Sequence, residues 1–337
     1  SPDGGGAQPV LIADEGRLFA LWSGGPVGTI YVSQASVQDA YAPDGWSEPA
    51  PLPAAAATGG SPAALVDAYG ALHIVYAAPL NEGRGIYYVR TDRDPDAGLV
   101  TIDPEAEPVR VFDAEAAGWS MVDHPALALD PAGTLHAVWV RGSSGGPFPP
   151  RAVLHARSSD GGETWSEATT LAEGGYDWPL VAAPLAGEVH VLWNEADGGG
   201  WTHRWSLDYG RTWTYQQQVR GFRDVPGAAA LTADGAGDLH LVGLGREDGG
   251  APAVRYAIWR WAEERWEEEA LFAIEPAADA ELDPVPGIAA ALQDARGRLD
   301  VVFRARLIDP GEGEDGAVDI LHTGLAVPSV SEEQAPA

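Results

Sequence analysis

One short sequence pattern occurs six times along the chain, and this repetition constrains the fold more than any other feature of the sequence. The clearest copy runs from Pro125 to Trp139 and reads P-A-L-A-L-D-P-A-G-T-L-H-A-V-W. A period of this kind has to be recognised before any local pattern is interpreted, because it decides the architecture. The other five copies span residues 9–22, 62–76, 179–193, 226–242 and 286–303.

Each copy has the parts of a β-hairpin. Proline is tolerated at the first residue of a strand, where no ladder donor is needed. The run Asp130-Pro131-Ala132-Gly133 supplies turn geometry and positive φ at low cost. The run 135–139 that follows is β-branched and aromatic, which favours a second strand. The sequence therefore predicts six hairpins.

Equivalent positions in the second strands are spaced by 54, 63, 54, 50 and 60 residues. Further strand-like runs follow the hairpins, such as G-I-Y-Y-V-R at 85–90. Residues 261–271 look helical by their local sequence, but their position in the repeat predicts a turn followed by a fourth strand. Four strands repeated six times predict an all-β, six-bladed β-propeller of four-stranded antiparallel blades. Ala-rich first strands suit the crowded positions around the axis. The equivalent positions are Phe19, His73, His136, His190, His240 and Asp300.

The propeller is expected to form one domain over residues 9–327. Residues 1–8 are Gly-rich and are interpreted as a leader, and residues 328–337 as a tail or linker stub. The sixth unit has no evident fourth strand. Residues 325–330, the leader or a partner chain are the candidates to complete that blade, and an open edge would also allow self-association.

Composition limits the possible partners. Asp and Glu number 50 against 20 Lys and Arg, for a net charge of −30, so the chain would repel nucleic acid. Without cysteine, neither a disulfide nor a thiolate site can form. No apolar run is long enough to span a bilayer. We expect no cofactor, although the acidity leaves open a structural calcium ion.

A second motif, S-x-D-x-G-x-T-W, occurs at 158–165 and again at 206–213. Both copies lie between the third and fourth strands of their units. The Asp carboxylate is suited to accept N–H groups of a turn, the Gly to reverse the chain, and the Trp to pack the turn onto the blade. These features predict a structural turn.

The motif resembles the Asp-box, or BNR repeat, of the sialidase (neuraminidase) superfamily, and the hairpins extend the resemblance over nearly the whole chain. The resemblance implies a sialidase-like propeller in which the boxes are structural and lie on the face away from the active site. A degenerate remnant is present at 44–46. The residues assigned to the two full boxes are Ser158, Asp160, Gly162, Thr164, Trp165, Ser206, Asp208, Gly210, Thr212 and Trp213.

Four histidines occupy equivalent strand positions, one in each of four units. Histidine is a common metal ligand, but side chains on separate blades would stand far apart. We therefore interpret these histidines as packed and hydrogen-bonded, with no metal site.

The resemblance also implies what a sialidase would require: three arginines that grip a carboxylate, a Tyr nucleophile assisted by Glu, and an Asp acid/base. The first arginine of that family lies in a motif whose place here reads A-Q-P-V-L-I at 7–12, without Arg. This argues against sialidase activity. If the chain is an enzyme, the catalytic candidates are Asp123, Tyr176, Glu195, Arg223, Arg246 and Arg304.

Loops that enter first strands, or leave second strands, are expected to surround a central pocket. The sequence favours a secreted or cell-surface, non-catalytic module that binds a glycan or a surface protein there. An exo-acting glycoside hydrolase of sialidase type and a subunit of a larger surface assembly are the alternatives. The ligand-binding candidates are Trp119, His124, Tyr176, Asp177, Trp178, Asn194, Asp197, Arg223, Arg246 and Arg306.

Overall fold

The chain folds as a series of antiparallel sheets, each built from consecutive strands. A computed structural model shows five four-stranded sheets, which we call blades 1 to 5, and a three-stranded C-terminal sheet. The residues described are 7–14, 16–25, 28–53, 62–80, 82–91, 100–103, 106–142, 150–195, 200–220, 222, 229–246, 252–273, 281–293, 297–308 and 318–326.

The strands of each sheet follow chain order from the inside outward. Blade 1 comprises β1 (Ala7–Asp14), β2 (Arg17–Gly24), β3 (Thr29–Ser36) and β4 (Ala50–Pro51). Blade 2 comprises β5 (Pro62–Val66), β6 (Leu72–Ala78), β7 (Gly85–Thr91) and β8 (Val109–Asp113). Blade 3 comprises β9 (Met121–Leu129), β10 (Leu135–Gly142), β11 (Pro150–Ser158) and β12 (Thr169–Glu173).

The remaining sheets repeat this arrangement. Blade 4 comprises β13 (Tyr176–Ala182), β14 (Val189–Glu195), β15 (Gly200–Ser206) and β16 (Gln217–Gln218). Blade 5 comprises β17 (Ala229–Ala233), β18 (Leu239–Arg246), β19 (Pro252–Arg260) and β20 (Arg265–Ala273). The C-terminal sheet comprises β21 (Glu281–Gln293), β22 (Arg298–Ile308) and β23 (Val318–Ala326).

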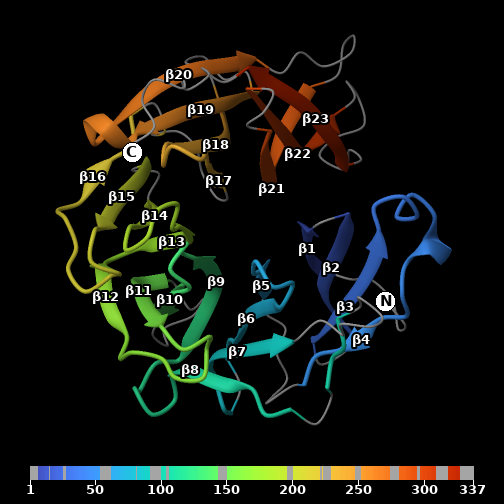
Figure 1. Cartoon of the computed structure of the whole chain (residues 1–337). Coiled ribbons are helices and arrows are strands. Elements are labelled where there is room, and N and C mark those ends of the chain that lie inside the picture. Colours follow the sequence, from blue (N-terminus) through green and yellow to red (C-terminus); the bar gives the residue numbers. More distant parts are fainter. Residues whose placement is uncertain are drawn as a thin grey trace.

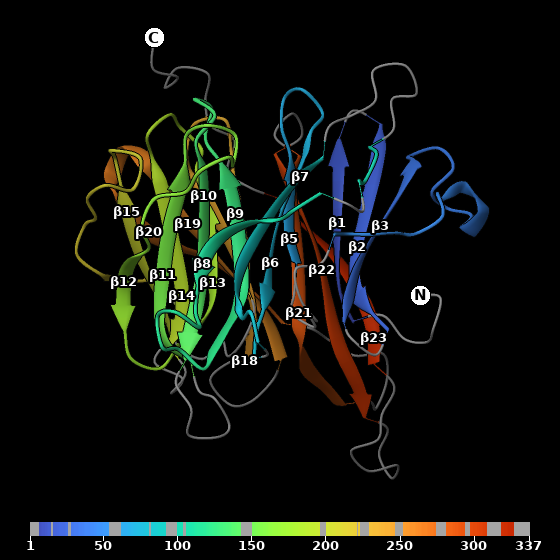
Figure 2. The ribbon, with the colours of Figure 1, turned by 90° about the horizontal axis from the view of Figure 1, so that it is seen from below.

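The sheets succeed one another around a central axis, with the first strand of each nearest that axis (Figure 1). Seen from the perpendicular direction, the inner strands run along the axis (Figure 2). This arrangement is a β-propeller, as predicted. The segment that looked helical by its local sequence forms a single 3-10 turn, Trp261–Glu263, followed by β20.

The prediction of six four-stranded blades was wrong in number, since the described residues form five four-stranded blades and one three-stranded sheet. In the C-terminal sheet, β23 runs on to Ala326, and Leu325 pairs with Leu299 of β22. Part of the segment proposed for a fourth strand therefore belongs to the third. Residues 327–337, which include the predicted tail, lie outside the described residues, and β1 starts at Ala7, inside the segment interpreted as a leader.

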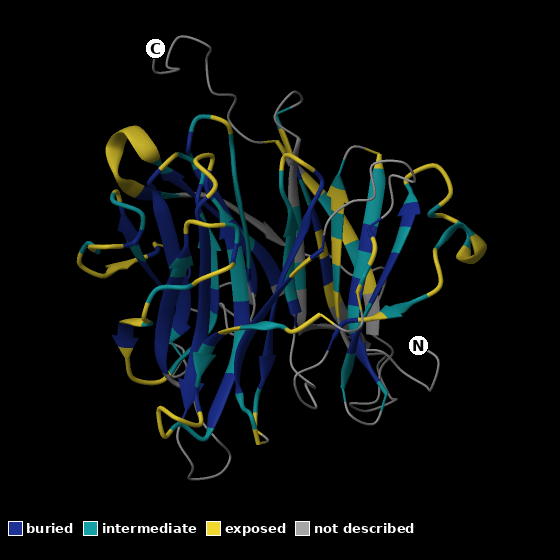
Figure 3. Ribbon diagram, turned by 60° about the horizontal axis from the view of Figure 1, so that its bottom comes forward, coloured by how far each residue is buried: buried dark blue, intermediate teal, exposed yellow. Residues whose placement is uncertain are grey.

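The core lies between neighbouring blades, because alternate residues of each strand face opposite sides. On β10, Trp139 packs toward blade 2, whereas Val138 and Val140 pack toward blade 4. All three side chains are fully buried, and each such burial stabilises the fold by roughly 1.5–3 kcal/mol. Figure 3 shows buried strand faces inside the propeller and exposed residues along the connecting turns.

The strand histidines are buried and hydrogen-bonded within their own blades. His136 Nδ1 lies 3.1 Å from Nε2 of His155 on the next strand, and desolvation lowers the pKa of His136 to about 4. The neutral imidazole of His136 thus joins the second and third strands of blade 3. The equivalent pairs are His73 with Tyr88, His190 with His203, and His240 with Tyr256.

The two S-x-D-x-G-x-T-W segments form closely similar turns. In the first, Gly162 N donates to Ser158 Oγ over 2.9 Å, and Thr164 N donates to Asp160 Oδ1 over 3.0 Å. Hydrogen bonds from Thr164 lower the pKa of Asp160 to about 2. The second turn has the same bonds from Gly210 to Ser206 and from Thr212 to Asp208.

The tryptophan of each turn reaches the preceding blade. Trp165 meets Tyr88 of blade 2 edge-on, with ring centroids 5.4 Å apart, and Trp213 meets His155 of blade 3 at 5.0 Å. These turns therefore join adjacent blades.

The only helical segments among the described residues are two single 3-10 turns. Neither has the length or the apolar character needed to cross a membrane.

Candidate functional site

Two adjacent inner strands carry the same three-residue pattern where they begin. Asp123-His124-Pro125 lies on β9, and Asp177-Trp178-Pro179 lies on β13. In both strands the pairing with the second strand shifts register at this point. His124 and Trp178 therefore occupy β-bulges, which re-aim side chains.

The backbone at both bulges is left-handed. His124 has φ 47° and Trp178 has φ 49°, which are uncommon values for residues other than glycine. In each case the preceding Asp accepts the residue's own N–H group through Oδ1, over 2.8 Å at His124 and 2.9 Å at Trp178. Such conformations cost about 1–3 kcal/mol and concentrate at functional sites. The backbone strain therefore marks His124 and Trp178 as candidate site residues.

The two bulges bring their side chains together. The imidazole of His124 stacks on the indole of Trp178, with centroids 4.0 Å apart and planes inclined by 19°. His124 Nδ1 also lies 2.5 Å from Asp177 Oδ1. Both side chains of that pair remain partly exposed, His124 at 19% and Asp177 at 23%. We call Asp123, His124, Asp177 and Trp178 the rim cluster.

The acidic neighbours of His124 determine its protonation. Burial by itself would lower the pKa of His124, but the hydrogen bond and charge of Asp177, together with the charge of Asp123, raise it above the ordinary value. The imidazole is therefore held protonated to higher pH than a free histidine. When His124 is charged, the rim cluster carries one positive and two negative charges, so it offers both donors and acceptors.

Three further candidates lie at the same end of blade 4. Tyr176 pairs across the strands with Glu195, and its ring meets Trp193 edge-on at 5.9 Å. Asn194 is buried and pairs with Asp177. Glu195 Oε1 accepts a hydrogen bond from Thr202 over 2.9 Å. The sequence placed these residues at the rim, and the strand register brings them beside the rim cluster.

Trp119 has a different environment. The guanidinium of Arg141, at the end of β10, lies 3.5 Å from the centroid of its ring. Arg141 is buried, its Nη2 lies 3.5 Å from Glu173 Oε1, and its Nε and Nη1 have no hydrogen-bond partner among the described residues. Arg141 was not among the residues predicted from sequence, because nothing in the run W-V-R-G at 139–142 marks an arginine that folds inward.

The predicted arginines are described only in part. Arg304 is exposed on β22, whereas only the backbones of Arg246 and Arg306 are described. Arg223 and Asp197 lie outside the described residues. A convergence of three arginines therefore stays a prediction. Among the residues that the structure covers, no three His, Asp or Glu side chains are grouped as a metal site would need.

Comparison with known proteins shows the fold. No protein-family model matches the chain, and no curated protein sequence matches it. A protein of unknown function from Dyadobacter fermentans DSM 18053 aligns with a TM-score of 0.59 at 18% identity, covering 96% of this chain and 95% of that one.

Two solved structures with recorded activities also align. Hadza microbial sialidase Hz136 gives a TM-score of 0.58 at 17% identity, over 88% of this chain and 62% of that one. A PL25 ulvan lyase bound to GlcA(1-4)Rha3S gives 0.52 at 13% identity, over 94% and 84%. At such identities the likeness shows the fold alone, a β-propeller of the kind found in sialidases and in these polysaccharide lyases.

Proposed function

We propose that this chain is a carbohydrate-binding propeller that holds a saccharide at the rim cluster without cleaving it. One observation carries the proposal: His124 and Trp178, both in left-handed conformations, stack on each other while His124 bonds Asp177. Packing alone gives no reason for two strained bulges to meet at the entrance of two inner strands, whereas a binding site does.

The chemistry of the rim cluster suits sugar hydroxyl groups. The hydrogen bonds of Asp123 and Asp177 described above all use Oδ1. Within the described residues, Oδ2 of each carboxylate has no hydrogen bond, so both oxygens can accept from a diol. The Nε2 of protonated His124 adds a donor. A saccharide has both kinds of group on each ring.

The comparisons support the ligand class. The Hz136 neighbour is a sialidase, and the PL25 neighbour is a polysaccharide lyase bound to a saccharide. We place this chain in the same chemical setting, as a secreted or cell-surface module that recognises a glycan, free or carried by a surface protein. The absence of Arg from residues 7–12 favours binding without sialidase catalysis.

A second candidate is an exo-acting glycoside hydrolase of sialidase type. The observation that favours it is the His124–Asp177 pair, since a histidine whose pKa is raised by a carboxylate can donate a proton near neutral pH. Turnover of a fluorogenic sialoside, lost in Asp177→Asn, would establish this alternative. Absence of turnover by a preparation that binds glycans favours the binding module.

A third role, as a subunit of a surface assembly, concerns the C-terminal sheet. There β23 pairs with β22, and the described residues include no strand on its other side. An open strand edge is a template for pairing with another chain. Light scattering at increasing protein concentration tests self-association: a constant monomer mass excludes it, and a dimer mass supports it.

A glycan array tests the binding proposal. The wild-type chain should retain a defined set of saccharides, and Asp177→Asn and His124→Gln should each weaken that binding by about tenfold or more. Glu263 is exposed on the 3-10 turn of blade 5, outside the two blades that form the rim cluster. Glu263→Gln removes one charge there and should leave saccharide binding intact. Equal binding by all four proteins would refute the site.

A further inference from the structure

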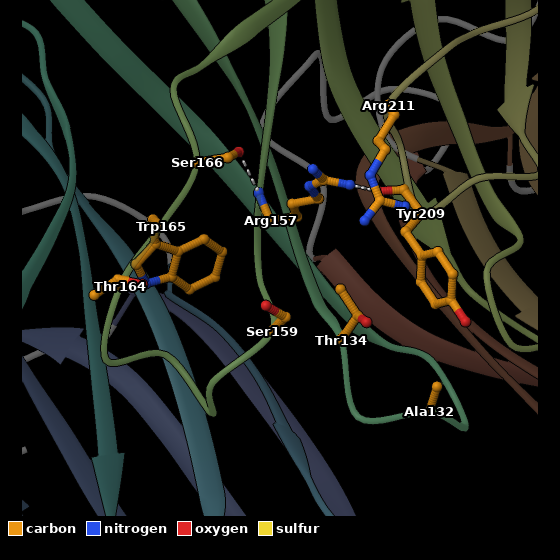
Figure 4. Close-up of a pocket in the computed structure, with 9 residues that line it drawn as sticks. All are labelled: Ala132, Thr134, Arg157, Ser159, Thr164, Trp165, Ser166, Tyr209 and Arg211. Carbon is orange, nitrogen blue, oxygen red and sulfur yellow. Dashed lines mark hydrogen bonds between the residues drawn. The ribbon is translucent and has the colours of Figure 1, made fainter.

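A cavity of about 500 Å³ lies between the S-x-D-x-G-x-T-W turns of blades 3 and 4. From the rim cluster, β9 runs to Leu129 and ends at the turn whose Thr134 lines this cavity, so the two sites lie at opposite ends of blade 3. Its size falls within the range typical of small-ligand sites. Figure 4 shows side chains from both blades around it.

Two arginines from different blades meet in this cavity. Arg157 comes from β11 of blade 3, and Arg211 comes from the turn of blade 4. Arg157 Nη1 donates to the carbonyl of Tyr209 over 3.0 Å, and Arg211 Nη1 donates to the carbonyl of Asp208 over 3.1 Å. Each guanidinium therefore keeps further N–H donors, and within the described chain neither forms an ion pair with a carboxylate.

The carboxylate of Asp208, in the same turn as Arg211, is already hydrogen-bonded. Asp208 Oδ1 accepts the N–H groups of Arg211 and Thr212, and its carboxylate also accepts the hydroxyls of Ser206 and Thr212. These bonds hold the turn together and engage both carboxylate oxygens, but the charge of Asp208 still acts on Arg157, where it partly offsets the lowering of the guanidinium pKa. Burial and the charge of Arg211 lower the pKa of Arg157, which fits two cations held close together.

The remaining walls suit a sugar. None of the described residues that line the cavity is acidic, in a chain whose net charge is −30. Thr134 and Ser159 present hydroxyl groups, and Trp165 and Tyr209 stand on opposite sides in Figure 4. Aromatic faces pack against the C–H face of a sugar ring, while hydroxyls bond its oxygens.

We infer that this cavity binds a saccharide unit bearing an oxyanion, either a sulfate ester or a carboxylate, with Arg157 and Arg211 on the anionic group. Guanidinium forks match planar and tetrahedral oxyanions by paired hydrogen bonds. The inference is independent of the rim cluster, which lies at the other end of the blade.

Isothermal titration of the full chain tests this inference with four probes: N-acetylglucosamine 6-sulfate, glucuronate, N-acetylglucosamine and inorganic sulfate. The sulfated or the carboxylated sugar should bind, and affinity should fall with added salt. Arg211→Gln should weaken that binding by about tenfold, since it removes one of two cations. Arg265→Gln, which removes an exposed arginine of blade 5 paired with Glu263 and Glu267, should leave it unchanged.

Arg157→Gln is a second variant of the same cavity. Because it also loses the hydrogen bond to the carbonyl of Tyr209, its thermal unfolding transition is compared with that of Arg211→Gln, to establish that both variants are folded before their binding is compared. Binding that survives in His124→Gln supports a site separate from the rim cluster.

The inference is overturned if neither anionic sugar binds, or if Arg211→Gln binds as the wild type does. It is also overturned if N-acetylglucosamine binds as tightly as its sulfate, or if inorganic sulfate alone binds as tightly as the sulfated sugar.

Discussion

Gly210 of blade 4 lies against the imidazole of His155 in blade 3, so closely that a Cβ atom at position 210 would stand 2.4 Å from Cε1 of that ring. His155 is buried and hydrogen-bonded to His136, so its ring has little room to move. Gly210 also has φ +75°. Both the conformation and the contact require glycine at this point of the turn.

Gly210→Ala should therefore destabilise the protein by about 3 kcal/mol, through left-handed strain and overpacking together. Gly133→Ala is the matched control, because Gly133 has φ +88° and no atom of the described residues lies within 4 Å of the added Cβ atom. It should cost only about 1 kcal/mol, from strain alone. Urea unfolding of the three proteins measures both values. Equal losses for the two variants would mean that the turn does not press on His155.

The left-handed backbone of His124 predicts a reversed order for two small substitutions. In an ordinary strand Ala is more stable than Gly by about 0.5–1 kcal/mol. At φ 47° the order should reverse, with His124→Gly more stable than His124→Ala by about 1 kcal/mol. Thermal unfolding of the two variants measures which of them is more stable. A more stable alanine variant would show that the bulge is not left-handed.

The buried histidines predict a loss of stability on mild acidification. Desolvation lowers the pKa of His136 to about 4, and burial lowers those of His155 and His203 well below the ordinary value. Below about pH 6.5 these histidines bind protons in the unfolded chain but stay neutral in the folded chain. The stability present above about pH 6.5 is therefore lost as pH falls toward 4. For His136 alone the shift corresponds to about 3 kcal/mol.

His124 acts in the opposite sense. Its raised pKa gives stability that is fully present below about pH 6.5 and is lost as pH rises through the folded value. Urea midpoints between about pH 7 and about pH 4.5 should therefore fall with acidification, and fall more steeply in His124→Gln. A stability that stays level or increases as pH drops would contradict the assignment of neutral buried imidazoles.

The sequence was most informative about the blades and less so about the site. Strand periodicity and the recurrence of His73, His136 and His190 at matching positions predicted the four-stranded sheets, because burial between blades imposes that pattern. The C-terminal sheet differed, since β23 pairs on to Ala326, and apolar pattern alone does not set where a strand ends.

The sequence also predicted that His124 and Asp177 lie at the rim, but it did not predict that their side chains contact each other. Their contact depends on two bulges whose only signal is the repeated pattern Asp-x-Pro, at 123–125 and 177–179. The inward fold of Arg141 onto Trp119 and the meeting of Arg157 with Arg211 arise from packing between elements distant in sequence. No local pattern reports contacts of that kind.

Contact between His124 and a saccharide at the rim is the central claim for this protein. Side-chain resonances of ¹⁵N-labelled histidines, with that of His124 identified by its loss in His124→Gln, can be followed as a saccharide selected on the glycan array is added. We predict that the His124 signal shifts in step with binding, while the buried His136 and His155 signals stay in place. Binding that proceeds with the His124 signal unmoved would contradict the central claim.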